Sequence, residues 1–172
     1  MKILKVIPIS LLLIGGISNN HFLLAENKEA SSYKVMSNDN DKLSINNVQK
    51  LLIEGDRFIK LGEFDKAKEY YDNGRNLAKQ LSGFYRDLNG AFRGLDARIP
   101  REMDDKGRKS LSAWADANAR LAALYKRKNQ PEVAVPLLVE IIKLMSPSST
   151  QGKAAFGDLR ELGFVDTNYQ GI

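Results

Sequence analysis

In the stretch LIEGDRFIKLGEFDKAKEYYDNG, residues 52–74, small and aromatic residues recur at helical intervals, and this pattern predicts how the first two helices pack. Gly55 stands three positions before Phe58, and Gly62 stands two positions before Phe64. A glycine inside a helix costs about 1 kcal/mol relative to alanine, so its presence needs a compensating contact. We therefore expect two helices to approach so closely at Gly55 that a side chain would not fit between them.

The apolar residues around this stretch also follow the helical period, and no segment shows the alternation that is typical of a β-strand. Asn46 or Asn47 is expected to cap the first helix. Pro100 is expected to end the third helix, because the residue before a proline is pushed out of helical geometry. The first three apolar stripes run through residues 48–61, 64–81 and 84–95.

The carboxyl-terminal half continues the helical pattern. Acidic residues at the start of residues 101–128 and basic residues at their end suit the two ends of a helix, so this segment is one long helix or two helices that break near 107–112. Pro131 stands at the favoured first position of a further helix, which Pro136 is expected to bend. A last short helix is expected in residues 150–163, and the sequence therefore predicts an all-α protein.

Two of the expected helix pairs share a pattern of small and aromatic positions. In the first pair these positions are Gly55, Phe58, Gly62, Phe64, Ala67, Tyr71 and Gly74. In the second pair they are Ala122, Tyr125, Asn129, Pro131, Ala134 and Leu138. The pattern resembles the tetratricopeptide repeat (TPR), a helical hairpin of about 34 residues. Phe58 and Tyr125 lie 67 residues apart, close to two repeat lengths.

The resemblance implies a short right-handed superhelix of antiparallel helix pairs, with about three TPR-like repeats. The middle repeat is degenerate or belongs to a longer irregular connection, because Arg101 and Asp105 stand where the family has an alanine and an aromatic residue. The helix in residues 150–163 would be the carboxyl-terminal capping helix. The chain from residue 26 onward also resembles exported repeat proteins of photosynthetic bacteria.

The first 25 residues differ in composition from the rest. Lys2 and Lys5 precede an apolar run from Val6 to Ile17, which small residues follow, and this is the order of a secretory signal peptide. The segment is either cleaved or kept as an anchor, although its apolar run is shorter than the about 20 residues that span a membrane. The expected organisation is a signal peptide in 1–25, a flexible linker in 26–45, the TPR-like domain in 46–163 and a tail in 164–172.

The residue types available from residue 26 onward exclude several chemistries. The chain has no cysteine, and its one histidine, His21, lies in the expected signal peptide. Nucleophile systems built on histidine, zinc sites built from His and Cys, and disulfides are therefore excluded from the domain. We expect no catalytic residues, no cofactor and no metal, and an enzyme would have to use only carboxylates and arginine.

In the family that the repeats resemble, the first helix of each pair lines a concave groove that binds peptides or protein segments. By position, the resemblance places seven polar residues there, and the arginines among them could bind an acidic segment. They are Asp56, Lys60, Arg86, Asn89, Arg93, Asp116 and Arg120. Gln49, Leu52 and Ala123 are placed beside them. The family's clamp for chaperone carboxyl termini is absent, because Leu52 and Asp56 replace its lysine and asparagine.

Charge and composition indicate a binding protein more than an enzyme. Of 26 basic and 21 acidic residues, eleven basic and six acidic ones fall in residues 82–130, so the middle of the chain is basic. This could support peripheral attachment to an anionic membrane or an acidic partner, whereas no nucleic-acid partner is expected. The leading hypothesis is an exported, non-catalytic scaffold or adaptor in the periplasm or an equivalent lumen, such as a thylakoid lumen. The alternative is an accessory subunit of a larger envelope or photosynthetic-membrane complex, and the oligomeric state stays open.

Overall fold

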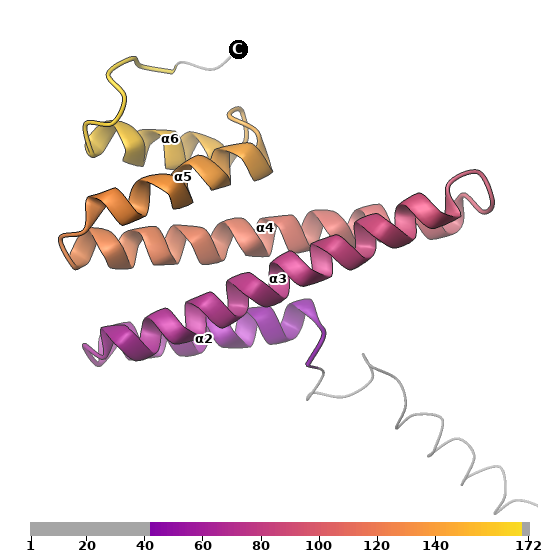
Figure 1. Ribbon diagram of the computed structural model, residues 1–172, viewed down its shortest axis with the longest axis horizontal. Coiled ribbons are helices and arrows are strands. Elements are labelled where there is room, and N and C mark those ends of the chain that lie inside the picture. Colours follow the sequence, from indigo (N-terminus) through magenta and orange to yellow (C-terminus); the bar gives the residue numbers. More distant parts are fainter. Residues whose placement is uncertain (1–41, 170–172) are drawn as a thin grey trace, which may run out of the picture. The chain divides into compact units, whose positions relative to one another are not determined.

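Five α-helices make up the regular structure of residues 42–169, the part of the chain that the computed structural model describes (Figure 1). They are α2 (Ile45–Lys60), α3 (Phe64–Phe92), α4 (Arg98–Arg127), α5 (Pro131–Met145) and α6 (Thr150–Glu161). The all-α prediction is confirmed, since no strand occurs in this range. The expected signal peptide in residues 1–25, the linker up to residue 41 and the last three residues of the tail lie outside the described part.

Each helix packs against the next one along the chain, and consecutive helices run in opposite directions (Figure 1). α2 also touches α4, so α2, α3 and α4 enclose one core while α4, α5 and α6 enclose another. α3 and α4 extend beyond the other helices (Figure 1). We call this extension, residues 82–110 with the turn between the two helices, the arm.

The arm corrects one expectation from the sequence. The stripes in residues 64–81 and 84–95 were expected to be separate helices, but they belong to the single helix α3, which ends at Phe92. Residues 101–128 likewise belong to one helix, so the break near 107–112 does not occur. The middle repeat is therefore not a separate hairpin, because its two halves are the outer parts of α3 and α4.

The turn at the end of the arm explains where α3 stops and α4 begins. Arg93 leaves helical geometry and Gly94 adopts φ +85°, a conformation that favours glycine. Pro100 does not end a helix as expected. It lies in the first turn of α4, where a proline is tolerated because the first amide groups of a helix have no partner within it.

The residue that caps the first helix is not the one expected from the sequence. Ser44, rather than Asn46 or Asn47, caps α2, and its Oγ accepts a hydrogen bond of 3.1 Å from the backbone N–H of Asn47. Gly62 follows α2 with φ +75°, which allows the tight turn into α3. The turn therefore fixes α2 antiparallel to the first half of α3.

The close approach expected at Gly55 is confirmed. A β-carbon there would lie 2.6 Å from Cδ1 of Tyr71, whose ring packs directly on the glycine. Gly74 on α3 is also close to α2, since a β-carbon would lie 3.0 Å from Cδ2 of Leu52. Phe58 stacks on Tyr70 beside this contact, with ring centroids 5.2 Å apart. Small residues at the contact and aromatic residues around it thus hold the first hairpin together.

The second core is built mainly from small and branched residues of α4, α5 and α6, and α5 continues through Pro136. Its buried members are Ala115, Ala122, Ala134, Leu138, Ile141, Ala155 and Leu159. Trp114 is partly buried against the first core, and Tyr125 is partly buried against both cores. Gly163 ends α6 with φ +69°, as expected, and no helix follows it up to residue 169.

Three polar side chains join the two cores. Arg75 of α3 donates one hydrogen bond to Oδ1 of Asn118 and another to Oε2 of Glu140, both 2.6 Å long. Asn118, which is fully buried, donates a third to Glu140 at 2.8 Å. Because α3, α4 and α5 each contribute one residue, this network fixes the three helices relative to one another.

Acid is expected to weaken this network. Burial alone would raise the pKa of Glu140, but the hydrogen bonds from Arg75 and Asn118 outweigh it and hold the pKa below its usual value. A depressed pKa stabilises the fold above the unfolded value of about 4.5, and this stabilisation is lost as the pH falls through the folded value. Urea unfolding between pH 6 and pH 3 should therefore show falling stability, and Glu140→Gln should reduce that slope. Glu69→Gln, on the exposed surface of α3, should leave the slope unchanged, and an equal effect of the two variants would contradict the prediction.

Candidate functional site

A cavity of about 380 Å³ lies between α2 and α4, with one wall from α3. Its lining combines apolar side chains with an acidic group and three cations. The lining residues are Asp56, Ile59, Lys60, Tyr71, Arg120, Ala123, Leu124 and Arg127. We call it the α2/α4 groove. It lies between α2 and α4, the first helices of the two pairs whose sequence pattern resembles the TPR, and its use as a binding surface stays a prediction.

Asp56 is the central polar group of the α2/α4 groove. Its Oδ1 accepts a hydrogen bond of 2.7 Å from the hydroxyl of Tyr71 and one of 3.0 Å from Nε of Arg120. Burial and the hydrogen bond to Asp56 raise the pKa of Tyr71 well above its usual value, so this hydroxyl keeps its proton and donates it. Arg120 also donates to the backbone carbonyl of Asp116 at 3.4 Å. The fold therefore fixes the carboxylate and one guanidinium in place.

Two further cations of the α2/α4 groove have no such partner. Lys60, at the end of α2, and Arg127, at the end of α4, make no ion pair or side-chain hydrogen bond within residues 42–169. Asp56 is shared between Tyr71 and Arg120, so it leaves the two cations uncompensated. An incoming carboxylate could pair with them without breaking an existing contact.

The candidate residues from the sequence fall into two groups. Asp56, Lys60 and Arg120 line the α2/α4 groove, and Ala123 lies among them. Asp116 is close by but is engaged with α6, because Gln151 donates a 2.6 Å hydrogen bond to its Oδ1. Gln49 is exposed on α2 and lies outside the cavity. Leu52 is a correction, since it is buried in the first core and its side chain packs near Gly74.

The other three candidates, Arg86, Asn89 and Arg93, lie on the arm. They line a separate cavity of about 460 Å³ between α3 and α4, with Met103 and Trp114. Asn89 is only 8% exposed, and its amide donates to the carbonyl of Pro100 at 3.0 Å and to Asp104 at 2.7 Å. Asn89 therefore holds the arm together. The structure does not bring these three residues into the α2/α4 groove, because the middle repeat is part of the arm.

The sequence analysis missed four residues of the α2/α4 groove, the apolar Ile59 and Leu124 and the polar Tyr71 and Arg127. Tyr71 was assigned to helix packing, yet its hydroxyl reaches Asp56 while its ring fills the space at Gly55. Arg127 was assigned to the basic end of a helix, yet it faces the cavity. The signal that could have found it is position, because Arg127 stands seven residues after Arg120 and thus on the same helix face.

The described residues contain neither a metal-binding cluster nor a membrane span. No group of three or more His, Cys, Asp or Glu side chains in residues 42–169 could hold a metal ion. None of the helices in the same range is long and apolar enough to cross a membrane.

Comparisons with family models, with curated proteins and with solved structures gave no match for this chain.

The ion pair between Asp56 and Arg120 should contribute modestly to stability. Both side chains are more than a third exposed, at 39% and 35%, so solvent screens their attraction. A double-mutant cycle with Asp56→Ala and Arg120→Ala, followed by urea unfolding, should give a coupling energy of about 0.5–1 kcal/mol.

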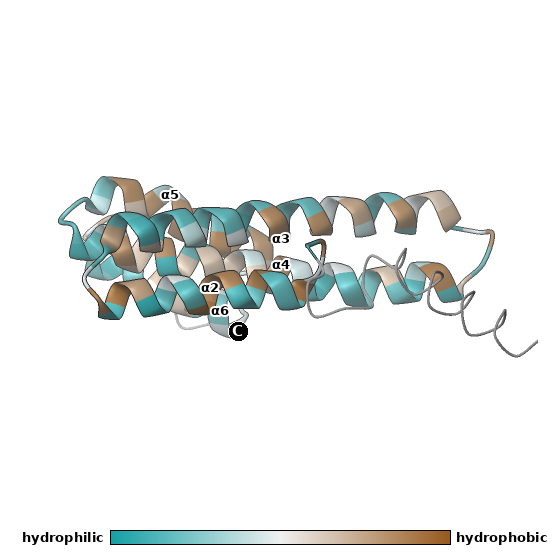
Figure 2. Ribbon diagram, turned by 90° about the horizontal axis from the view of Figure 1, so that it is seen from below, coloured by the Kyte–Doolittle hydropathy of each residue, from teal (hydrophilic) through white to brown (hydrophobic). Residues whose placement is uncertain are grey.

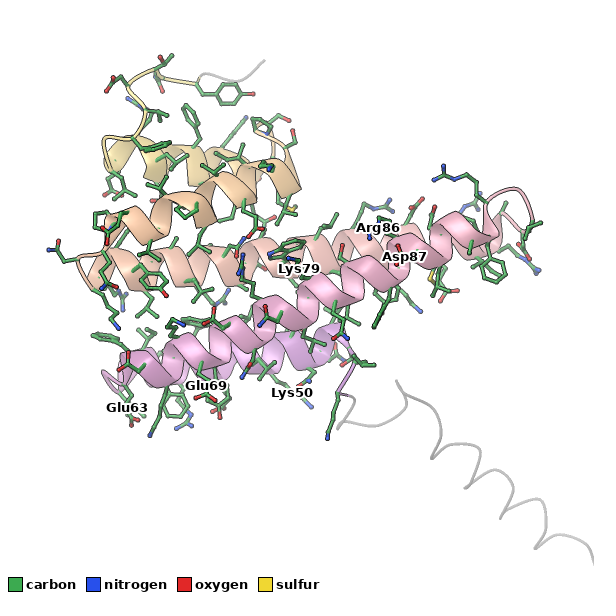
Figure 3. The ribbon with its side chains drawn as sticks, viewed as in Figure 1. Lys50, Glu63, Glu69, Lys79, Arg86 and Asp87 are labelled. Carbon is green, nitrogen blue, oxygen red and sulfur yellow. The ribbon has the colours of Figure 1, made fainter. Side chains whose placement is uncertain are left out.

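Arg86 and Asp87 on the arm provide the control pair for this cycle, and Figure 3 labels both. Their side chains are 79% and 71% exposed, and 3.3 Å separates the charged atoms. The same cycle should give a coupling energy near zero for this pair. Equal coupling in the two pairs would contradict the assigned role of Asp56 as the fixed centre of the groove.

Proposed function

We propose that this chain is an exported, non-catalytic TPR-like scaffold or adaptor that binds a segment of another protein at the cell envelope. The observation that carries the proposal is the α2/α4 groove, where Lys60 and Arg127, at the carboxyl ends of α2 and α4, have no acidic partner beside the fixed pair Asp56–Arg120. The apolar lining supplies contact area, and the two free cations favour a segment with acidic side chains.

The finer architecture in this proposal is a short right-handed superhelix of TPR-like pairs. The hairpins α2/α3 and α4/α5 would be its repeats, joined by the long helices of the arm, and α6 would be the capping helix. Two features support it: consecutive helices pack in chain order, and the small residues of the first pair lie at the close contact between its helices. The basic and apolar amino-terminal sequence supports export.

Exposed apolar residues on the first hairpin support the alternative, an accessory subunit of a larger complex. Ile53 on α2 is 62% exposed, and Leu61 after α2 is 58% exposed. In a permanent complex such residues would be covered, so the purified chain would aggregate without its partner. A monomeric chain that unfolds cooperatively would favour the adaptor.

Site-specific photocrosslinking in the native cells tests the adaptor proposal. A crosslinking amino acid at Ala123, in the groove, should give an adduct of defined mass with a partner protein. The same amino acid at Asn76, on the exposed surface of α3, should not give this adduct. The double charge reversal Lys60→Glu/Arg127→Glu should abolish the Ala123 adduct, since it replaces both free cations. No adduct at Ala123, or an adduct that the reversal leaves intact, would remove the groove proposal.

A further inference from the structure

An apolar stripe on α3 is covered by α2 in the first half of the helix and uncovered in the arm. In the first half, Tyr70 stacks on Phe58 of α2 and Gly74 faces Leu52. Leu81, Phe84 and Leu88 follow at steps of three and four residues and therefore lie on the same face of α3. Hydrophobic residues continue along α3 into the arm, where only α3 and α4 lie side by side (Figure 2).

The exposure of the stripe increases towards the end of the arm. Leu81 is buried, Phe84 and Leu88 are each 45% exposed, and Leu95 in the turn is 78% exposed. No other helix of residues 42–169 covers them, because α2 begins only at Ile45, opposite the inner part of α3. The arm therefore exposes an apolar stripe that runs from Phe84 near its base through Leu88 to Leu95 in the turn, and we call these three residues the arm stripe.

Cations outnumber acidic groups at the end of the arm. The charged residues from 93 to 101 are Arg93, Asp96, Arg98 and Arg101. Arg98 donates to Asp96 from Nη2 at 2.7 Å and from Nε at 3.1 Å, so this carboxylate is already paired. The neighbouring acidic residues are paired as well, Asp87 with Arg86 and Glu102 with Lys106. Arg93 and Arg101 have no carboxylate partner in the described part of the chain, and Arg93 contacts only the amide oxygen of Asn89 at 3.4 Å.

The size of the exposed stripe argues against a second copy of the chain as its occupant. The three side chains of the arm stripe together expose on the order of 300 Å², whereas a stable protein interface buries about 800 Å² on each partner. A lipid surface has no such requirement, because a few inserted side chains and a few cations near the phosphates suffice for weak adsorption.

We propose that the arm adsorbs lengthwise to anionic lipid bilayers, with Leu95, Leu88 and Phe84 entering the headgroup region. Arg93 and Arg101 contact the lipid phosphates, and each adds about fivefold to the affinity. Attachment is weak and reversible, since three partly exposed apolar side chains supply its hydrophobic part. The arm extends beyond the other helices (Figure 1), so this contact leaves the α2/α4 groove open and does not depend on the proposed function.

Fluorescence from a single site tests the proposal in the full chain. Because the sequence has no cysteine, Leu95→Cys allows one environment-sensitive dye to be attached at the end of the arm. Vesicles of phosphatidylcholine with phosphatidylglycerol should shift its emission to the blue and raise its intensity severalfold, whereas phosphatidylcholine alone should not. Leu61→Cys is the matched control, because Leu61 is an exposed leucine in the turn at the other end of α3. The dye at position 61 should not respond, even if the amino-terminal segment binds the vesicles.

Charge reversal separates adsorption from other causes of the signal. In the chain labelled at position 95, Arg93→Glu/Arg101→Glu should raise the lipid concentration for half-maximal response by about 25-fold or more. Lys153→Glu on α6 should leave it unchanged. Three results would overturn the proposal: no response at position 95, equal responses at 95 and 61, or a response at 95 that grows with protein concentration in the absence of lipid. The last result would show that a second copy covers the arm stripe.

Discussion

Gly55→Leu should lower the free energy of unfolding by about 3 kcal/mol or more, because it overpacks the contact between α2 and α3. Even the first added carbon would lie 2.6 Å from Cδ1 of Tyr71. The ring cannot retreat easily, since Tyr71 is only 2% exposed and its hydroxyl is hydrogen-bonded to Asp56 at 2.7 Å. Urea unfolding followed by circular dichroism measures the loss.

Gly83→Leu is the matched control for this prediction. Gly83 also lies inside a helix, but a β-carbon there would meet no other atom within 4 Å. Leucine has the higher helix propensity, so this variant should be as stable as the wild type or up to about 1 kcal/mol more stable. If Gly55→Leu and Gly83→Leu had the same effect, the close contact at Gly55 would be refuted.

A compensating change tests whether Tyr71 is the cause. Gly55→Ala alone should destabilise the fold, and Tyr71→Leu alone should do so by removing the ring and its hydrogen bond to Asp56. In the double variant the smaller side chain makes room for the added methyl group, so the two losses should not add. Additive losses would show that the clash involves some other neighbour.

The helices and the first hairpin could be predicted because local patterns decide them. The glycine and aromatic spacing of residues 52–74 places a close contact at Gly55, and the structure has it there. The continuity of α3 was also visible in principle, since Leu77, Leu81, Phe84 and Leu88 follow one another at helical steps without a break. The prediction nevertheless divided this stripe between residues 81 and 84, whereas Gly83 in that gap lies in open space and does not interrupt the helix.

The sequence could indicate only in part which candidate residues lie together. Asp56, Lys60 and Arg120 belong to α2 and α4 and line one cavity, and their role in binding stays a prediction. Arg86 and Arg93 were placed through a middle hairpin that does not exist as a separate unit. Once α3 is one helix, these two side chains lie on the arm.

No pattern in the sequence predicts the hydrogen-bond network that joins the two cores. Arg75 and Glu140 are 65 residues apart, and each is an ordinary polar residue of a helix when its own segment is considered alone. Their hydrogen bonds depend on the packing of α3 and α5 on opposite sides of Asn118. Contacts of this kind follow from the tertiary arrangement, which periodicity within single helices does not define.

Gly152→Ala should detach α6 from the rest of the domain. A β-carbon at Gly152 would lie 2.9 Å from the carbonyl carbon of Ser146 and still closer to its oxygen, and backbone atoms cannot move aside as a flexible side chain can. The turn is held by Ser149, whose Oγ accepts from the N–H of Gly152 at 2.9 Å and donates to Ser146 at 2.9 Å. The added methyl group and this capping turn therefore cannot coexist.

The loss of structure in Gly152→Ala should be limited to α6, because α6 is the last helix and packs mainly on α5. Hydrogen exchange should become fast for the amides of α6 as Ala155 and Leu159 leave the second core, while the amides of α2 and α3 keep their protection. Gly157→Ala is the control on the same helix, since a β-carbon there would meet nothing within 4 Å and alanine favours the helix. Unchanged exchange of α6 in Gly152→Ala would show that the turn can adapt, whereas loss of protection throughout α2–α5 would show that the two cores unfold as one unit.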